Sequence, residues 1–237
     1  MNPSSKLDSS PIWADVTPVD ARSLPRVVAQ ALRSGKLPSD RVFDRFLPPE
    51  LRAWSGQYWT PLVVAARAAQ WLDQLNVRSV VDIGSGTGKF CVAAALLANA
   101  RFIGVEQRQR LVEASRQLAG VFDLNERIAF LHSTFGEVPM PKADAYYMYN
   151  PFGENLFGFQ DRLDDDVELC GARYLRDVAA VEQLLRDASV GTFLLTYNGF
   201  GGALPADYRE VRVDRELPSV LRMWRKGEEA SSAPLAQ

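Results

Sequence analysis

The chain has 237 residues, of which 47% are hydrophobic, so it is long enough to bury one sizeable core. Its 27 basic and 29 acidic side chains give a net charge of −2, which argues against a protein that binds nucleic acid through a broad basic field. Two distant cysteines, Cys91 and Cys170, and one histidine, His132, argue against a disulfide framework and a zinc cluster. With neither a signal peptide nor a membrane-spanning run, we expect a soluble cytoplasmic protein.

The first third of the chain is predicted to be a helical extension of the main domain. Residues 1–18 are rich in Ser, Pro and Asp, and we expect them to be disordered or loosely packed. Residues 19–75 carry apolar side chains at helical spacing and form the predicted extension, which we expect to act as a lid. Within it, Thr60 and Pro61 have the residue types of an N-cap and a first helical position, so a helix is predicted from there to about Leu75.

Residues 76–228 are predicted to form one α/β domain. Short β-rich runs are expected at 79–83, 101–105, 128–131, 145–149 and 192–197, and helices at 89–98, 108–119 and 173–188. This alternation predicts a Rossmann-like, doubly wound, mainly parallel sheet. The runs 208–213 and 220–226 alternate and predict an antiparallel hairpin at the C-terminal edge, while 229–237 is an expected flexible tail.

A glycine-rich turn directly follows the first predicted strand. The strand ends at Asp82, the turn reads Gly84-Ser85-Gly86-Thr87-Gly88, and a helix begins at Lys89. Ligands of open α/β sheets bind at the carboxyl ends of the strands. A dinucleotide-binding turn would read GxGxxG with its acid far downstream, so a dehydrogenase is the least favoured enzyme. An acid before a GxGxG turn instead favours a cofactor with a cationic sulfonium. A turn without any ligand is the alternative.

The second predicted strand also ends in an acid, Glu106. In nucleotide-binding folds, an acid at this position accepts hydrogen bonds from the hydroxyl pair of a ribose. A solvated loop glutamate is the alternative, but the nearby glycine turn makes the ribose contact the better interpretation.

These motifs, Asp82 to Gly88 and Gly104-Val105-Glu106, resemble the class I S-adenosylmethionine (SAM)-dependent methyltransferases. They are most similar to the protein-lysine branch, with its Dot1-like and small Gly-Ser-Gly-type enzymes, and Tyr58-Trp59-Thr60-Pro61 is similar to an aromatic stretch upstream in that branch. The resemblance covers residues 57–224 and implies SAM as the cofactor, without a metal. The cofactor-binding residues that it implies are Asp82, Gly84, Ser85, Gly86, Gly88, Lys89, Glu106, Gln107, Thr134, Phe135, Asn150, Trp59 and Thr60.

The acceptor side of the predicted site follows the fourth strand. Tyr149-Asn150-Pro151-Phe152 resembles the Asn-Pro-Pro-aromatic motif of amino-group methyltransferases, in which the Asn accepts hydrogen bonds from the amine and orients its lone pair toward the methyl group. Phe152 replaces the second proline, which argues against nucleobase recognition. By this resemblance the catalytic residues are Asn150 and Tyr58, and the substrate-binding residues are Pro151, Phe152, Glu154 and Tyr197. A structural turn with Phe152 in the core is the alternative.

Two further features are weaker. His132 ends the third predicted strand and fits a strand-end histidine better than a catalytic one. The acidic segment 161–168 fits a solvated loop better than a lip that attracts a basic substrate. We therefore expect an N-methyltransferase acting on an amine of a protein or small molecule. O- or C-methylation of a metabolite is the second hypothesis, and a SAM-binding module without turnover the third.

Overall fold

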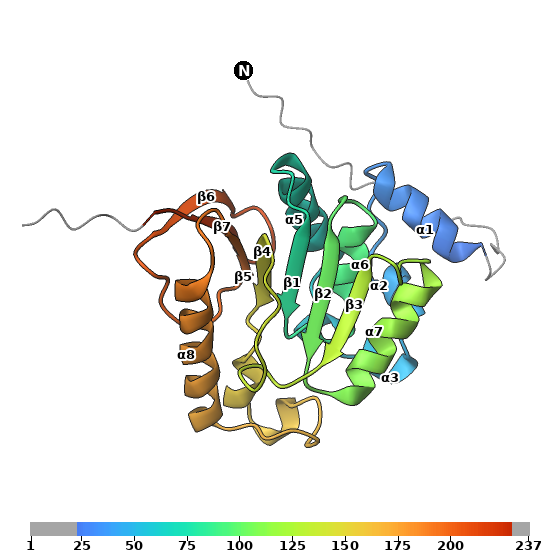
Figure 1. The fold of residues 1–237 in the computed structure, drawn as a ribbon. Coiled ribbons are helices and arrows are strands. Elements are labelled where there is room, and N and C mark those ends of the chain that lie inside the picture. The colour runs from blue at the N-terminus through green and yellow to red at the C-terminus, as the bar shows by residue number, and fades with distance from the viewer. Residues whose placement is uncertain (1–22, 229–237) are drawn as a thin grey trace, which may run out of the picture.

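The computed structural model describes residues 23–228, drawn in colour in Figure 1. The expectations for residues 1–18 and 229–237 therefore lie outside the described part of the chain. The helices are α1 (Leu24–Arg33), α2 (Asp40–Phe43), η1 (Asp44–Phe46), α3 (Pro49–Arg52), α4 (Ser55–Tyr58), α5 (Leu62–Gln74), α6 (Lys89–Ala95), α7 (Gln109–Val121), η2 (Gly153–Leu156), η3 (Phe159–Asp161) and α8 (Gly171–Asp187). The strands are β1 (Ser79–Ile83), β2 (Arg101–Glu106), β3 (Ile128–His132), β4 (Ala145–Tyr149), β5 (Phe193–Tyr197), β6 (Tyr208–Asp214) and β7 (Leu221–Lys226).

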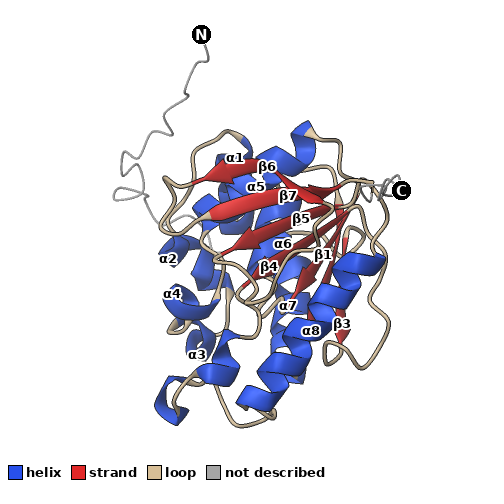
Figure 2. Ribbon diagram, turned by 90° about the vertical axis from the view of Figure 1, so that its left-hand side faces the viewer, coloured by secondary structure: helices blue, strands red, loops and turns tan. Residues whose placement is uncertain are grey.

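The strands form one seven-stranded sheet in the order β3-β2-β1-β4-β5-β7-β6. The first five strands are parallel, and β7 and β6 add to β5 as an antiparallel hairpin. Figure 2 shows the hairpin at one end of the twisted sheet. The predicted Rossmann-like sheet with an antiparallel C-terminal edge is therefore confirmed. Because the strand order reverses between β1 and β4, a crevice is expected where these two strands end.

The parallel strands β1, β2, β4 and β5 are largely buried on both faces, which explains why they read as apolar runs. In β1, Val80 belongs to the core on one face and the next residue, Val81, to the core on the other. The first core is covered by α5, α6 and α7, and the second by α8, as Figure 1 shows. The helices therefore lie on both faces of the sheet, as a doubly wound fold requires.

The helical extension packs against the same face as α6 and α7. Phe43 stacks on Phe122, which directly follows α7, with ring centroids 5.4 Å apart. The expected N-cap of α5 is wrong in detail: α5 begins at Leu62, whose amide donates to Asp40 Oδ1 of the extension at 2.9 Å. Thr60 instead pairs with the hydroxyl of Tyr147 at 3.0 Å in the core. Sequence spacing could not show this cap because Asp40 is distant along the chain.

Some helix ends differ from expectation, because local composition fixes a helix better than its ends. The helix after the glycine turn ends at Ala95 instead of Ala98, and α8 begins at Gly171 instead of Arg173. Among residues 23–228, no helix is both long and apolar enough to cross a membrane.

Candidate active site

The glycine turn after β1 is held in backbone conformations that favour glycine. Gly84, Gly86 and Gly88 have φ angles of +76°, +54° and +70°, where a side chain would be strained. The amides of Gly84 and Ser85 both donate to the carbonyl of Val105, at 2.9 and 3.0 Å. The turn is thereby tied to the end of β2, next to Glu106.

Glu106 lies beside this turn and is buried. Its carboxylate accepts the amide of Gly86 at 3.0 Å and the amide of Arg108 at 2.9 Å. Burial raises the pKa of Glu106, although these backbone bonds favour the ionised form. The second predicted acid is therefore part of the glycine turn and does not lie in a solvated loop.

Asp82, the first predicted acid, is buried deeper than Glu106, at 3% exposure. Its carboxylate is 3.4 Å from the Cys91 thiol, which donates to it. Burial raises the pKa of Asp82 to about 7, and the nearby Glu106 also raises it while the thiol bond lowers it. Asp82 does not line the pocket at the strand ends, and its side-chain contact is with Cys91 of α6.

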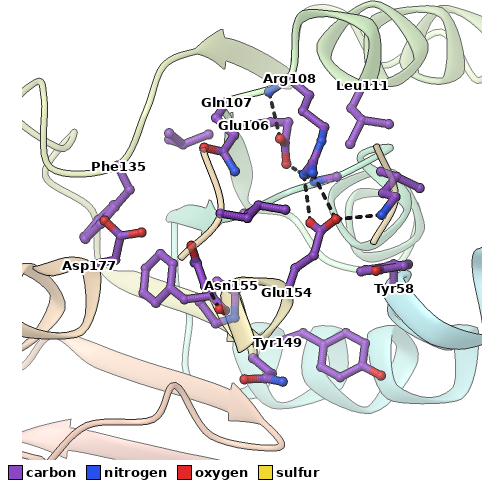
Figure 3. Close-up of a pocket in the computed structure, with 18 of the residues that line it drawn as sticks. Tyr58, Glu106, Gln107, Arg108, Leu111, Phe135, Tyr149, Glu154, Asn155 and Asp177 are labelled. Atoms are coloured by element: carbon purple, nitrogen blue, oxygen red, sulfur yellow. Dashed lines mark hydrogen bonds and ion pairs between the residues drawn. The ribbon is translucent and has the colours of Figure 1, made fainter. Parts of the chain in front are cut away.

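A pocket of about 240 Å³ opens where the strand ends meet, shown in Figure 3. It brings together both halves of the predicted site. Predicted residues that line it are Tyr58, Trp59, Gly84, Gly86, Glu106, Gln107, Phe135, Asn150, Pro151, Phe152 and Glu154. The cofactor motif and the acceptor motif therefore share one cavity, although they are separated in sequence.

Other predicted residues do not line this pocket: Asp82, Ser85, Gly88, Lys89, Thr60, Thr134 and Tyr197. The clearest departure is Lys89. Its side chain is 1% exposed, and its ammonium pairs with Asp40 at 2.6 Å and Asp44 at 2.7 Å. The expected cofactor contact of Lys89 is thus replaced by anchoring of the helical extension. Tyr197 packs on the pocket residue Tyr149, with ring centroids 4.8 Å apart.

Asn150 lies at the end of β4 with a φ of +39°, an uncommon conformation that asparagine tolerates. Its amide donates to the carbonyl of Gly199 at 3.1 Å. The carboxamide lies over Gly153: a Cβ on that glycine would come within 2.3 Å of Asn150 Nδ2. The next residue, Pro151, contacts the glycine turn, since a Cβ on Gly84 would be 3.0 Å from Pro151 Cβ. The acceptor motif therefore abuts the cofactor turn directly.

Tyr58 has a different position from that of a catalytic base. Its hydroxyl donates to the backbone carbonyl of Asp161, which also accepts from Gln57 Nε2 at 3.1 Å. Burial, with a contribution from Glu154, raises the pKa of Tyr58 to about 12, so the phenol stays protonated at neutral pH. Tyr58 lines the pocket, and its catalytic role stays a prediction; its hydroxyl ties the helical extension to the segment that holds Asp161.

Sequence reasoning missed the charged wall of the pocket. Arg108 is 5% exposed and pairs with Glu154 at 2.9 Å and Asp164 at 2.7 Å. Figure 3 shows the Arg108 and Glu154 side chains pointing toward each other. Arg173 and Asp177 of α8 also line the pocket, and Arg173 donates to Gln107 Oε1 at 2.7 Å. In the sequence, the only sign of these ion pairs was the opposite charge of residues 108–110 and residues 161–168.

The remaining predictions concern His132 and metals. His132 is exposed, and its Nε2 lies 2.8 Å from the carbonyl of Gln107, so it ties β3 to the loop after β2. Its position supports a structural histidine, while the neighbouring Ser133 lines the pocket in place of Thr134. Within residues 23–228, no group of three potential metal-ligating side chains is found.

Comparison with known families gives a consistent class. Residues 51–146 match the family model described as protein-L-isoaspartate(D-aspartate) O-methyltransferase. The ribosomal protein L11 methyltransferase of Klebsiella pneumoniae strain 342 is 31% identical over 94 residues, 39% of this chain and 31% of that protein. The corresponding Yersinia pseudotuberculosis IP 31758 protein is 32% identical over 94 residues, with the same coverage. The matched segment thus spans about a third of these curated relatives.

Two solved structures extend the likeness over most of the described fold. An RNA methyltransferase from Salinibacter ruber in complex with S-adenosyl-L-homocysteine (SAH) has a TM-score of 0.52 and 20% identity, covering 73% of this chain and 97% of that one. An O-methyltransferase from Bacillus cereus in complex with SAH has a TM-score of 0.55 and 12% identity, covering 84% and 97%. The sheet order, the glycine turn beside Glu106 and these likenesses together establish that the chain has the class I SAM-dependent methyltransferase fold.

Proposed function

We propose that this chain is a SAM-dependent methyltransferase that transfers the methyl group to an amine nitrogen of a protein or small molecule. The observation that carries the proposal is the shared pocket, which Asn150 and Gly84 both line and in which Pro151, the residue after Asn150, lies against Gly84 of the cofactor turn. The residues around Glu106 suit a ribose, because a buried carboxylate between two backbone amides has lone pairs left for hydroxyl donors.

Catalysis in this proposal is mainly positioning. When bound, SAM supplies an electrophilic methyl group on its sulfonium. The Asn150 carboxamide oxygen accepts a hydrogen bond from an N–H group of the acceptor amine. This bond directs the lone pair of the amine nitrogen toward the cofactor. The wall of Tyr58, Trp59 and Phe152 excludes water from the reacting groups. The amine attacks in its neutral form, so an ammonium acceptor first releases a proton to solvent; the phenol of Tyr58, protonated at neutral pH, does not take that proton.

A lysine side chain is the proposed form of the acceptor amine if the substrate is a protein. The similarity of Asp82 to Gly88 and of Tyr58 to Pro61 to the lysine-methyltransferase branch supports it. The net charge of −2 favours a protein or small molecule over a nucleic acid. We also propose a cytoplasmic location, because Cys91 and Cys170 are both free, as is usual in reducing compartments.

Methyl transfer to oxygen is the second candidate, favoured by the match of residues 51–146 to an O-methyltransferase family model. Mild base distinguishes methyl esters, which hydrolyse, from N-methyl groups, which do not, and chromatography of the acid hydrolysate distinguishes N-methylated amines from base-stable methyl ethers.

The test combines binding with transfer. Calorimetry of the full chain with SAM, SAH and NAD should give micromolar affinity for SAM and SAH and no detectable binding of NAD. Labelled SAM should then mark material in cell-extract fractions, and the label should survive mild base. Binding of NAD without SAM would overturn the methyltransferase assignment. Base-labile label would overturn only the choice of nitrogen.

A further inference from the structure

The segment between β4 and α8 forms one wall of the pocket and is held from two sides. We call residues 153–168 the acceptor lid. On one side, Asp161 of the lid accepts hydrogen bonds from Tyr58 and Gln57 of the helical extension. On the other, Glu154 and Asp164 pair with Arg108, two residues beyond the predicted ribose acid. The acceptor lid therefore bridges the extension and the end of β2.

Arg108 uses all three guanidinium nitrogens for this lid. Two nitrogens bind the two carboxylate oxygens of Glu154, at 2.9 and 3.0 Å, and Nε binds Asp164 at 2.7 Å. Such a bidentate pair fixes both distance and orientation. Glu154 Oε1 in turn accepts the amide of Leu163 at 2.7 Å, so the contact organises the lid internally. Although burial alone would lower the pKa of Arg108, Asp164 and Glu154 raise it, and the charge is retained.

The backbone of Arg108 is bound to the cofactor side of the pocket. Its amide donates to Glu106 Oε1 at 2.9 Å, while Gly86 donates to Oε2 of the same carboxylate at 3.0 Å. A ribose held by Glu106 would restrict this carboxylate and, through it, the backbone of residue 108. Because the guanidinium of that residue carries Glu154 and Asp164, the restriction would reach the acceptor lid.

The size of the cavity also calls for a lid that responds to ligands. About 240 Å³ is below the roughly 300–1,000 Å³ usual for small-molecule sites. A cavity of this size leaves room for the walls to respond when cofactor and acceptor are bound together. Of these walls, the acceptor lid is the one that Arg108 joins to Glu106.

We propose that Arg108 is a positioning residue that couples cofactor binding at Glu106 to the placement of the acceptor lid. This inference rests on the proposed function, because it takes SAM or SAH as the ligand at Glu106. Cofactor binding closes the lid through Arg108 and so prepares the acceptor side of the pocket. In the Arg108→Gln variant, bound cofactor no longer controls the lid.

The experiment is hydrogen exchange of the full chain with and without SAH. The SAH concentration for each variant is chosen from its calorimetric dissociation constant, so that all variants have the same SAH occupancy. In the wild type, SAH should slow exchange within residues 153–168 by about 5-fold or more, the lower end of usual couplings between sites. Arg108→Gln should lose this slowing. Glu154→Gln, a milder change that leaves Asp164 paired with Arg108, should lose at least half of it. A general loss of stability would change exchange equally with and without SAH, so the SAH-dependent difference reports the coupling.

Arg110→Gln is the matched control. Arg110 also pairs with Asp164, with Nε 2.8 Å from Oδ2, but it does not contact Glu154 or line the pocket. Its variant should keep the full slowing. Equal slowing in Arg108→Gln and wild type would overturn the proposal, as would an unresponsive lid in SAH-bound wild type. Absence of SAH binding to the wild type would overturn the proposed function itself, and the coupling with it.

Discussion

The indole of Trp59 lies directly on Gly86: a Cβ built on this glycine would approach Trp59 Cζ3 to 2.6 Å. The ring is held there by its Nε1, which donates to the carbonyl of Leu51 at 3.0 Å. The helical extension thus places an aromatic ring against the glycine turn, and its role as a lid stays a prediction.

Gly86→Ala should abolish SAH binding measured by calorimetry. The methyl group would collide with Trp59, and the φ of +54° would add strain of about 1–2 kcal/mol. Gly35→Ala is the matched control, because Gly35 has a similar φ of +77° and no neighbour within 4 Å of its Cβ position. Gly35→Ala should lower the melting temperature, because the positive φ strains the alanine backbone, and should leave SAH binding normal. Normal SAH binding by Gly86→Ala would mean that the turn is not the cofactor site.

Glu106→Gln should weaken SAH binding by roughly 10-fold to 100-fold, because hydrogen bonds to a charged acceptor contribute about 1.5–3 kcal/mol each. A glutamine offers only one acceptor oxygen, which the amides of Gly86 and Arg108 compete for. The measurement is a calorimetric dissociation constant, paired with circular dichroism to confirm the fold. An unchanged dissociation constant would show that Glu106 does not bind the ribose.

Asp82 gives a prediction for pH dependence. Because burial raises the folded-state pKa to about 7 from an ordinary 3.8, the folded protein binds a proton that the unfolded chain releases. The resulting stabilisation is complete below pH 3.8 and is lost as the pH rises through about 7. The melting temperature of wild type should therefore fall relative to that of Asp82→Asn between pH 5 and pH 8. Parallel curves for the two proteins would show that Asp82 is ionised throughout.

Lys89→Met tests the anchoring of the extension. The change leaves Asp44 buried without its cation, and breaking a buried pair in this way costs about 3–5 kcal/mol. Thermal unfolding should show this loss, and hydrogen exchange should increase over α2 and η1 more than over the sheet. Arg41→Met, which removes an exposed cation of α2, is the control and should have little effect. Equal stability of Lys89→Met and wild type would contradict the anchoring role.

The sequence predicted the sheet and the two strand ends that form the site, because buried parallel strands and glycine turns leave local signals. β4, for example, spans Ala145–Tyr149 as expected, which puts Asn150 at the predicted position. The errors concern contacts between distant residues. Arg108 and Glu154 are 46 residues apart in the sequence. Lys89 pairs with Asp40 of the helical extension, and no local sequence pattern predicts how the extension packs. Side-chain partners of this kind depend on the tertiary fold, so spacing along the chain could not identify them.

Replacement of Asn150 should reduce turnover far more than it weakens cofactor binding. Removing its carboxamide misaligns the acceptor amine, and about 1 Å of misplacement can cost on the order of 10²-fold in rate. Asn150→Gly is the cleaner deletion, because glycine accepts the φ of +39° without the strain that alanine would add. This variant should transfer labelled methyl groups to extract fractions about 100-fold more slowly, with SAH affinity close to that of wild type.

Two further variants of Asn150 and its neighbour decide what the carboxamide does. Asn150→Asp keeps an acceptor oxygen, so it should retain more activity than Asn150→Gly if the side chain accepts a bond from the amine. Asn198→Gly is the matched control: this asparagine follows the neighbouring strand β5, has a φ of +61° and also lines the pocket, but its Oδ1 accepts a hydrogen bond from Ser219 Oγ at 3.2 Å. It should lose much less activity. If Asn150→Gly labels the same material at the wild-type rate, Asn150 is structural, and the amine acceptor loses its main support.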